Sequence, residues 1–188
     1  MTTTRAERLT NRSATYVVAV PLPDAATLVA PWRATNRLGA HVTLLRPFTS
    51  APLTRDTRQR FARHVGREPR FDATLATVGR FGDRVVYARP DQGPRWAQLA
   101  RAAAHVLGRD ANDALLVPHV TVAKGISPAE LDDAAARTSA RLPWNVTARS
   151  VVLYQQDRVT GRWFPLVRAA LAGAPATPRR AGSHNSPP

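Results

Sequence analysis

The chain of 188 residues has room for one domain, or for two small lobes that share a core, and can bury that core without crosslinks. It contains no cysteine, which excludes disulfides, thiolate metal sites, iron–sulfur clusters and a cysteine nucleophile. The net charge of +14 at pH 7 is carried by arginine, since Lys124 is the single lysine. Such a surplus favours phosphate-bearing partners, but scattered arginines in an Ala- and Pro-rich chain also reflect GC-rich codons. Charge therefore permits a nucleotide substrate without indicating one.

Both ends of the chain have compositions typical of disordered segments. Residues 1–12 are polar and basic without periodicity, and residues 173–188 are rich in Pro, Ala, Gly and Ser. We expect a single domain over residues 13–172. The apolar run "YVVAV" at 16–20 is too short for a signal peptide or a membrane span. A soluble cytoplasmic protein that makes no contact with membranes is the expectation, and we expect a monomer.

The first half of the chain predicts three strands and two helices from its apolar periodicity and its turn residues. These elements are a strand at 14–22, a helix at 23–39 interrupted at Pro31, a strand from 40 that ends at Pro47, a helix at 53–67 and a strand at 70–81.

The second half repeats this order of elements. It comprises a strand at 84–90, a helix at 91–108, a strand at 117–125, a helix at 127–142, a strand at 144–156 and a final strand at 162–171. Ser127 and Glu130 form a capping box around Pro128, which marks the start of the fourth helix. The repeated order predicts two duplicated β/α halves related by a pseudo-twofold axis. That axis would bring the third element of each half together, side by side or across a central cleft.

The third element of each half carries the same motif, in "AHVTLLRPF" and in "VPHVTVAKG". Side chains alternate between the two faces of a strand, so His41 and Thr43 point the same way. His119 and Thr121 likewise share a face. The apolar residues between them are expected to face the helices and the core, which leaves both His–Thr pairs on the opposite surface.

Two imidazoles and two hydroxyls in one place suit phosphodiester transfer. A neutral His accepts the proton of the attacking water or alcohol, and a protonated His donates one to the leaving oxygen. Hydroxyls donate hydrogen bonds to the non-bridging phosphate oxygens. A single half-buried His on a strand is more often structural, but two matching copies make that explanation the weaker one. No carboxylate lies at ligand spacing to either His, so we expect no metal and no cofactor.

Five further residues are possible substrate contacts. Arg46 and Lys124 each lie five residues after a motif His, where alternation points them away from the cleft unless the strand ends twist. Phe48, Tyr87 and Tyr154 can stack on a nucleobase, although core packing is the commoner role of such aromatics.

The other three histidines receive no catalytic role. His64 lies late in an Arg-rich helix as a surface residue, His105 lies in a helix away from the motif strands, and His184 lies in the tail.

The paired motifs, their separation and the "AHVTLLRPF" context resemble the two-histidine (2H) phosphoesterase superfamily. More narrowly, the chain is similar to bacterial 2′-5′ RNA ligase and cyclic phosphodiesterase proteins over residues 14–171. The resemblance implies a bilobal α+β fold with antiparallel sheets around a central cleft and metal-independent chemistry. It implies that His41 and His119 are acid and base and that Thr43 and Thr121 bind the phosphate.

The function expected from this resemblance is hydrolysis of a cyclic phosphodiester on a nucleotide or an RNA end. The substrate would be a 2′,3′-cyclic phosphate or an ADP-ribose 1″,2″-cyclic phosphate. Formation of 2′-5′ RNA linkages is an alternative, and so is a module that binds RNA or nucleotides without turnover. Which His is acid and which is base stays open, since it depends on the orientation of the substrate.

Overall fold

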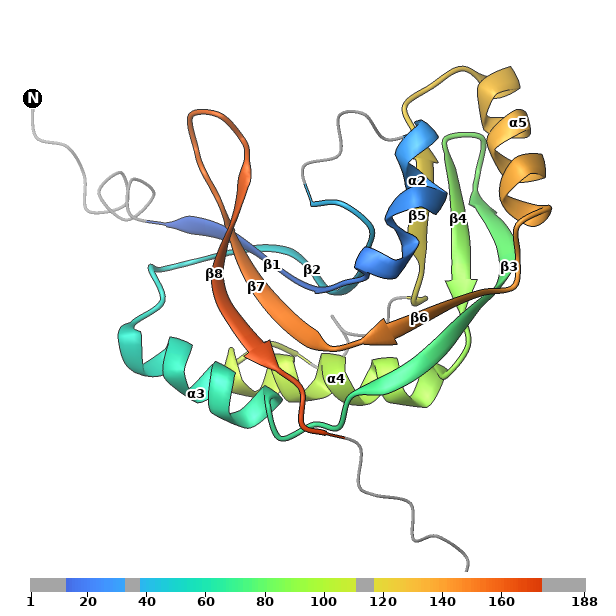
Figure 1. Ribbon diagram of the computed structural model, residues 1–188. Coiled ribbons are helices and arrows are strands. Elements are labelled where there is room, and N and C mark those ends of the chain that lie inside the picture. Colours follow the sequence, from blue (N-terminus) through green and yellow to red (C-terminus); the bar gives the residue numbers. More distant parts are fainter. Residues whose placement is uncertain (1–12, 33–37, 111–116, 174–188) are drawn as a thin grey trace, which may run out of the picture.

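The computed structural model describes residues 13–32, 38–110 and 117–173 (Figure 1). The expected disordered ends therefore lie outside the described residues, except for Gly173. In chain order the elements are β1 (Ala14–Pro21), the 3-10 turn η1 (Pro23–Ala25), α2 (Ala26–Val29), the 3-10 turn η2 (Ala30–Trp32), β2 (His41–Ser50), α3 (Arg55–Val65), β3 (Phe71–Phe81), β4 (Val85–Pro90), α4 (Gly93–Val106), β5 (Val120–Lys124), α5 (Pro128–Ser139), β6 (Trp144–Ala148), β7 (Ser150–Gln156) and β8 (Trp163–Ala170).

The strands form one eight-stranded antiparallel sheet in the order β6-β3-β4-β5-β2-β1-β7-β8. The predicted α+β class with antiparallel strands is confirmed. The two motif strands, β2 and β5, are neighbours at the middle of the sheet. The last strand of the first half, β3, pairs with β4, the first strand of the second half, and β7 of the second half pairs with β1. This order fits the duplication, but all strands belong to one sheet, so the division into lobes and the central cleft stay predictions.

The sheet curls strongly, which follows from its connectivity. Strands β6 and β7 lie near opposite ends of the strand order, yet only Arg149 separates them in the chain. The ends of the sheet must therefore approach each other, as Figure 1 shows. The single strand expected at 144–156 is wrong for this reason: the chain changes its pairing partner from β3 to β1 at Arg149.

All helices pack against one face of the sheet. Helices α3 and α4 contact each other and cover β8 and β2, whereas α2 and α5 cover β5, with α5 also on β3 and β4. Their apolar stripes enter one main core, to which α3 contributes Phe61 and Val65 and α4 contributes Trp96 and Leu99. The predicted capping box opens α5. No helix among the described residues is long and apolar enough to cross a membrane.

Two predicted elements differ because of proline. The helix expected at 23–39 is a series of short turns through Trp32, broken around Pro31, which lacks the N–H that a continuing helix needs. Strand β2 does not end at Pro47 but continues to Ser50. Its pairing with β1 shifts register beside Pro47, and such a shift tolerates a residue that cannot donate to the ladder.

Asp24, in the turn η1 after β1, connects this turn to β6 by hydrogen bonds. Its carboxylate accepts hydrogen bonds from the backbone N–H of Thr147 at 3.0 Å and from the Arg149 guanidinium at 2.6 Å. The Trp144 indole N–H donates to the Asp24 carbonyl at 2.9 Å. The hydrogen bond from Arg149 is the main reason why the pKa of Asp24 lies below its ordinary value, against a smaller opposing effect of burial.

Replacing Asp24 with Asn is expected to lower the free energy of unfolding at pH 7 by about 0.5–1 kcal/mol, a modest value because the pair is partly exposed. A lowered pKa in the folded state stabilises above the unfolded value of 3.8, and this stabilisation is lost as pH falls through the folded value. Urea unfolding at pH 7 and at successively lower pH below 3.8 should therefore show a gap that narrows as the solution becomes more acid. Asp83→Asn, at an almost fully exposed pair, is the control, and a D24N gap that persists in acid would contradict the account.

Candidate active site

The two motif strands bring their histidines and threonines onto one face. Val42 lies opposite Val120 in the β2–β5 pair, and both side chains are completely buried in the main core. This register places His41 opposite Thr121. It places Thr43 opposite His119.

These four side chains, here called the quartet, therefore project from the face opposite the helices. All four are half-buried. The histidines are diagonal neighbours in the register, a relation that separates side chains by roughly 7–8 Å in a regular antiparallel pair. That spacing leaves room for a group to lie between the two rings.

Both histidine rings are held in the same way. Nδ1 of His41 bonds to the Gly39 carbonyl at 2.8 Å, and Nδ1 of His119 bonds to the Val117 carbonyl at 2.7 Å. A carbonyl oxygen only accepts, so Nδ1 carries the proton in each ring. In a neutral ring Nε2 then has the lone pair and can accept a proton, and in a charged ring Nε2 can donate one.

A β-bulge follows the first His–Thr pair. Thr43 lies opposite Ala19 of β1. Leu45 lies opposite Val18, the adjacent residue of β1, so Leu44 is an extra residue in β2. Leu44 and Leu45 are both buried in the main core. The bulge therefore shifts the alternation of side chains by one position.

The second motif strand contains a bulge at the matching position. Thr121 lies opposite Tyr87 of β4. Ala123 lies opposite Val86, which leaves Val122 as the extra residue of β5. Val122 and Ala123 are both completely buried. The duplication thus extends to the local backbone irregularity, three residues after each histidine.

The bulges change where the two basic candidates lie. Simple alternation predicted that Arg46 and Lys124 face away from the quartet, and this is wrong. Lys124 lies opposite Val85, which shares a face of β4 with Tyr87 and hence with Thr121. Arg46 follows the doubled core positions of β2 in the same way, and both side chains are exposed. Each motif strand therefore offers a cation on the quartet face.

An aromatic group borders His119. The ring of Tyr87 lies 5.4 Å from the His119 ring, and Phe81 of β3 stacks on Tyr87 at 4.4 Å. Phe81 also meets His119 edge to face at 4.9 Å and is 41% exposed. Opposite Tyr87 lies Gly79, where a Cβ atom would overlap the tyrosine ring. Sequence reasoning missed Phe81 and Gly79. The available signal was the Gly82–Asp83 turn, which pairs β3 with β4 and places Gly79 opposite Tyr87.

Tyr154 lies on the same face on the other side of the quartet. It pairs with Val17 of β1 and joins a small apolar cluster with Ala19, the residue opposite Thr43. Trp163 packs against this cluster and Tyr154 is only 8% exposed. Burial raises the pKa of the Tyr154 hydroxyl, and the charge of Arg168 opposes this to a smaller extent.

Phe48 lies on the opposite side of the sheet. It is 8% exposed, belongs to the main core and contacts the ring of Tyr16 at 5.7 Å. The guanidinium of Arg109 lies 5.0 Å from its ring centre. Core packing, the alternative considered for this side chain, accounts for its position.

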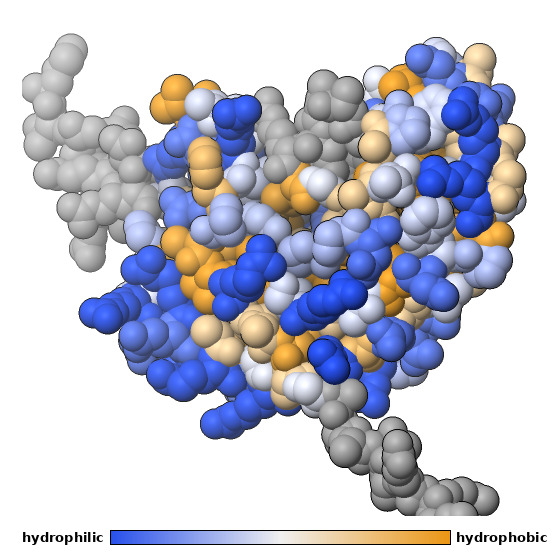
Figure 2. Space-filling view, in the orientation of Figure 1, coloured by the Kyte–Doolittle hydropathy of each residue, from blue (hydrophilic) through white to orange (hydrophobic). Residues whose placement is uncertain are grey.

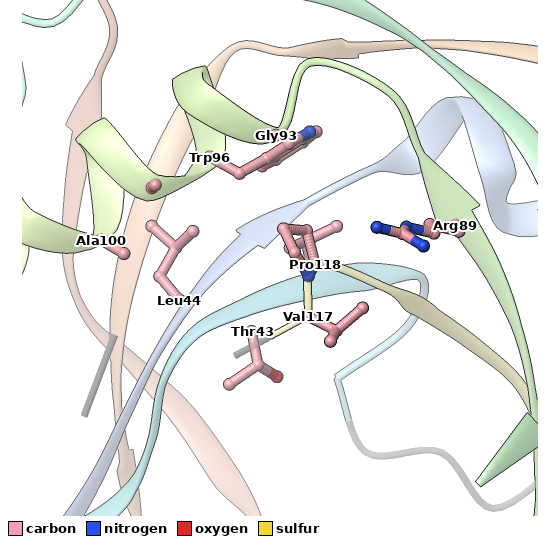
Figure 3. A pocket seen from close by; sticks show the side chains of 10 residues that line it. Thr43, Leu44, Arg89, Gly93, Trp96, Ala100, Val117 and Pro118 are labelled. Atoms are coloured by element: carbon pink, nitrogen blue, oxygen red, sulfur yellow. The ribbon is translucent and has the colours of Figure 1, made fainter. Parts of the chain in front are cut away.

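A cavity of about 240 Å³ lies beside Thr43 where β2 and β5 diverge (Figure 3). Beside His41, the backbone N–H of Leu22 donates a hydrogen bond to the Ala40 carbonyl at 2.9 Å and so joins the ends of β1 and β2. In the second half, Pro90 at the end of β4 corresponds to Leu22. Pro90 has no N–H, so β4 and β5 cannot form the equivalent hydrogen bond. The walls are mostly apolar, and Arg89 lies on the border. The lining consists of Val42, Thr43, Leu44, Arg89, Gly93, Trp96, Ala97, Ala100, Val117 and Pro118.

No three His, Cys, Asp or Glu side chains gather into a possible metal site within the described residues. The quartet and its neighbours Arg46 and Lys124 instead offer imidazoles, hydroxyls, a guanidinium and an amine, all able to donate hydrogen bonds to an anion.

The chain belongs to the 2′-5′ RNA ligase superfamily, which it matches over residues 21–160. No curated protein matches it.

Among solved structures, the chain is similar in fold to E. coli LigT complexed with 3′-AMP, at 23% identity and a TM-score of 0.57 over 86% of this chain and 99% of that one. E. coli LigT in its apo form gives the same values. A structure described as a phosphoesterase is similar at 22% identity and a TM-score of 0.56, over 85% and 99% of the two chains.

Gly79→Ala is expected to displace the Tyr87 ring and thereby change the surroundings of His119. The ring end of Tyr87 can move, so stability should fall by less than about 1 kcal/mol. The ring resonances of Tyr87 and His119 in NMR spectra measure the effect. Gly93→Ala, where a Cβ atom meets nothing within 4 Å, is the control and should leave both signals in place. Unchanged signals in G79A would contradict the proposed packing.

Proposed function

We propose that the protein is a metal-independent phosphoesterase that opens a cyclic phosphodiester on a nucleotide or an RNA end. The substrate class is a 2′,3′-cyclic phosphate or an ADP-ribose 1″,2″-cyclic phosphate. The observation that carries the proposal is the quartet, in which two identically oriented histidines alternate with two threonines across one strand pair. Membership of the 2′-5′ RNA ligase superfamily supports the same reaction class.

In the proposed step a water oxygen attacks the phosphorus atom. Nε2 of one histidine takes the proton of this water, and the bond between phosphorus and one ring oxygen breaks. The other histidine, protonated beforehand, gives its Nε2 proton to the departing oxygen, so the products are a phosphomonoester and an alcohol. The two histidines end with their protonation states exchanged, and proton exchange with solvent restores them.

The threonines and the nearby cations serve the phosphate in this proposal. Thr43 and Thr121 donate hydrogen bonds to its non-bridging oxygens, where negative charge concentrates in the transition state. Arg46 and Lys124 add positive charge on the same face. The exposed ring of Phe81, stacked on Tyr87, is suited to stack on a base or another planar group of the substrate.

Ligation is the alternative closest in chemistry. If the attacking oxygen belongs to the 5′-hydroxyl of a second RNA, the same opening of a cyclic phosphate forms a 2′-5′ linkage, and the family description favours this possibility. A binding module without turnover is the third candidate. Two histidines with the same ring orientation disfavour it, since binding a phosphate requires donors but no proton acceptor.

His41→Ala and His119→Ala are each expected to lower kcat/KM for 2′,3′-cyclic nucleotides by about 10²–10⁴-fold, because each removes one proton-transfer group. The measurement is turnover by purified protein in excess EDTA. His184→Ala, outside the described residues, is the matched control and should retain wild-type turnover. Turnover that survives both quartet substitutions would show that the site lies elsewhere. Tight nucleotide binding by an inert wild type would instead favour the binding module.

A further inference from the structure

A second cluster of basic side chains lies between α3 and α4, away from the quartet. It surrounds a cavity of about 250 Å³. The lining residues are Arg60, Arg63, His64, Arg67, His105 and Val106. No pattern in the sequence joins these residues, since arginines are scattered along the whole chain and the two histidines lie in different helices.

The arrangement on α3 is regular. Arg60, Arg63, His64 and Arg67 occupy positions i, i+3, i+4 and i+7, so they form one stripe along the helix and its last turn. The ring of His105 from α4 lies 5.5 Å from the ring of His64 and closes the cavity from the other side. We call these five side chains the basic stripe.

The positive charge of the stripe is largely uncompensated. Asp56 pairs with Arg60 at 3.0 Å, but no carboxylate of the described residues forms a salt bridge with Arg63 or Arg67. Like charges three or four residues apart destabilise a helix by a few tenths of a kcal/mol per pair. The dipole at the carboxyl end of α3 favours cations in its last turn, but it does not require a stripe that extends over two turns. An anion held in the cavity would offset this repulsion.

The basic stripe and the quartet lie on different faces of the sheet. Helices α3 and α4 pack on the core side of β2, whereas the quartet projects from the opposite side. Figure 2 shows hydrophilic side chains gathered at the lower left, where Figure 1 places α3. A single mononucleotide bound at the quartet cannot also contact the stripe, because the two sites lie on different faces of the sheet. An RNA strand carries phosphates along its length and can contact both sites.

We propose that the basic stripe binds backbone phosphates of an RNA strand whose end occupies the quartet, as a second contact on the other face of the sheet. This inference rests on the function proposed above. Guanidinium groups bind phosphate oxygens in bidentate fashion, and the two imidazoles add further donors. Such contacts fix the position of the strand and do not read its sequence.

The test is the salt dependence of RNA binding by the full chain with Arg63→Ala and Arg67→Ala combined. The probe is a fluorescent single-stranded RNA of about 20 nucleotides that ends in a 3′-phosphate. Each lost phosphate contact lowers the slope of log Kd against log salt by about 0.7, so the slope should fall by roughly 1.4. The control combines Arg55→Ala and Arg95→Ala, two exposed arginines of the same helices that do not line the cavity, and should keep the wild-type slope.

An unchanged slope in the R63A/R67A variant would overturn the inference, and so would an equal loss in the R55A/R95A control. Turnover of a 2′,3′-cyclic nucleotide by the wild type, measured on the same preparation, tests the proposed function separately. A failure of the RNA inference is therefore distinguishable from a failure of the proposed chemistry.

Discussion

The pairing of β2 with β5 is the constraint on which the candidate site depends. One register pair, Val42 with Val120, joins the two halves at the centre of the sheet, and both side chains are fully buried. A shift of one residue would turn these valines out of the core and turn the histidines into it. The cost of exposing two core valines, about 1.5–3 kcal/mol for each, therefore also keeps the quartet on one face.

The two bulges place positive charge beside the quartet. In a regular strand the cation that follows each motif would point to the helices and into the apolar core. A single extra core residue, Leu44 in one strand and Val122 in the other, returns Arg46 and Lys124 to the quartet face. Bulges beside functional sites commonly re-aim side chains in this way. The site thus gains positive charge without loss of buried apolar area.

The sequence allowed the fold class, the element order and the common face of the quartet to be predicted, because these follow from strand alternation and from a repeated motif. It could not reveal the bulges, since consecutive Leu44 and Leu45 read as an ordinary buried strand. The change of partner at Arg149 was also hidden, because both sides of it have strand composition. The basic stripe depends on contacts between α3 and α4, which no local pattern encodes.

The central claim is that His41 and His119 act in one proton-transfer step. A double-mutant cycle on 2′,3′-cyclic nucleotide turnover in excess EDTA tests it most directly, with each alanine variant and the variant that carries both. The account predicts that the double variant loses little more activity than either single variant, because removing one partner already disables the shared step. Losses that multiply would contradict the account, since they would mean that the two histidines contribute independently.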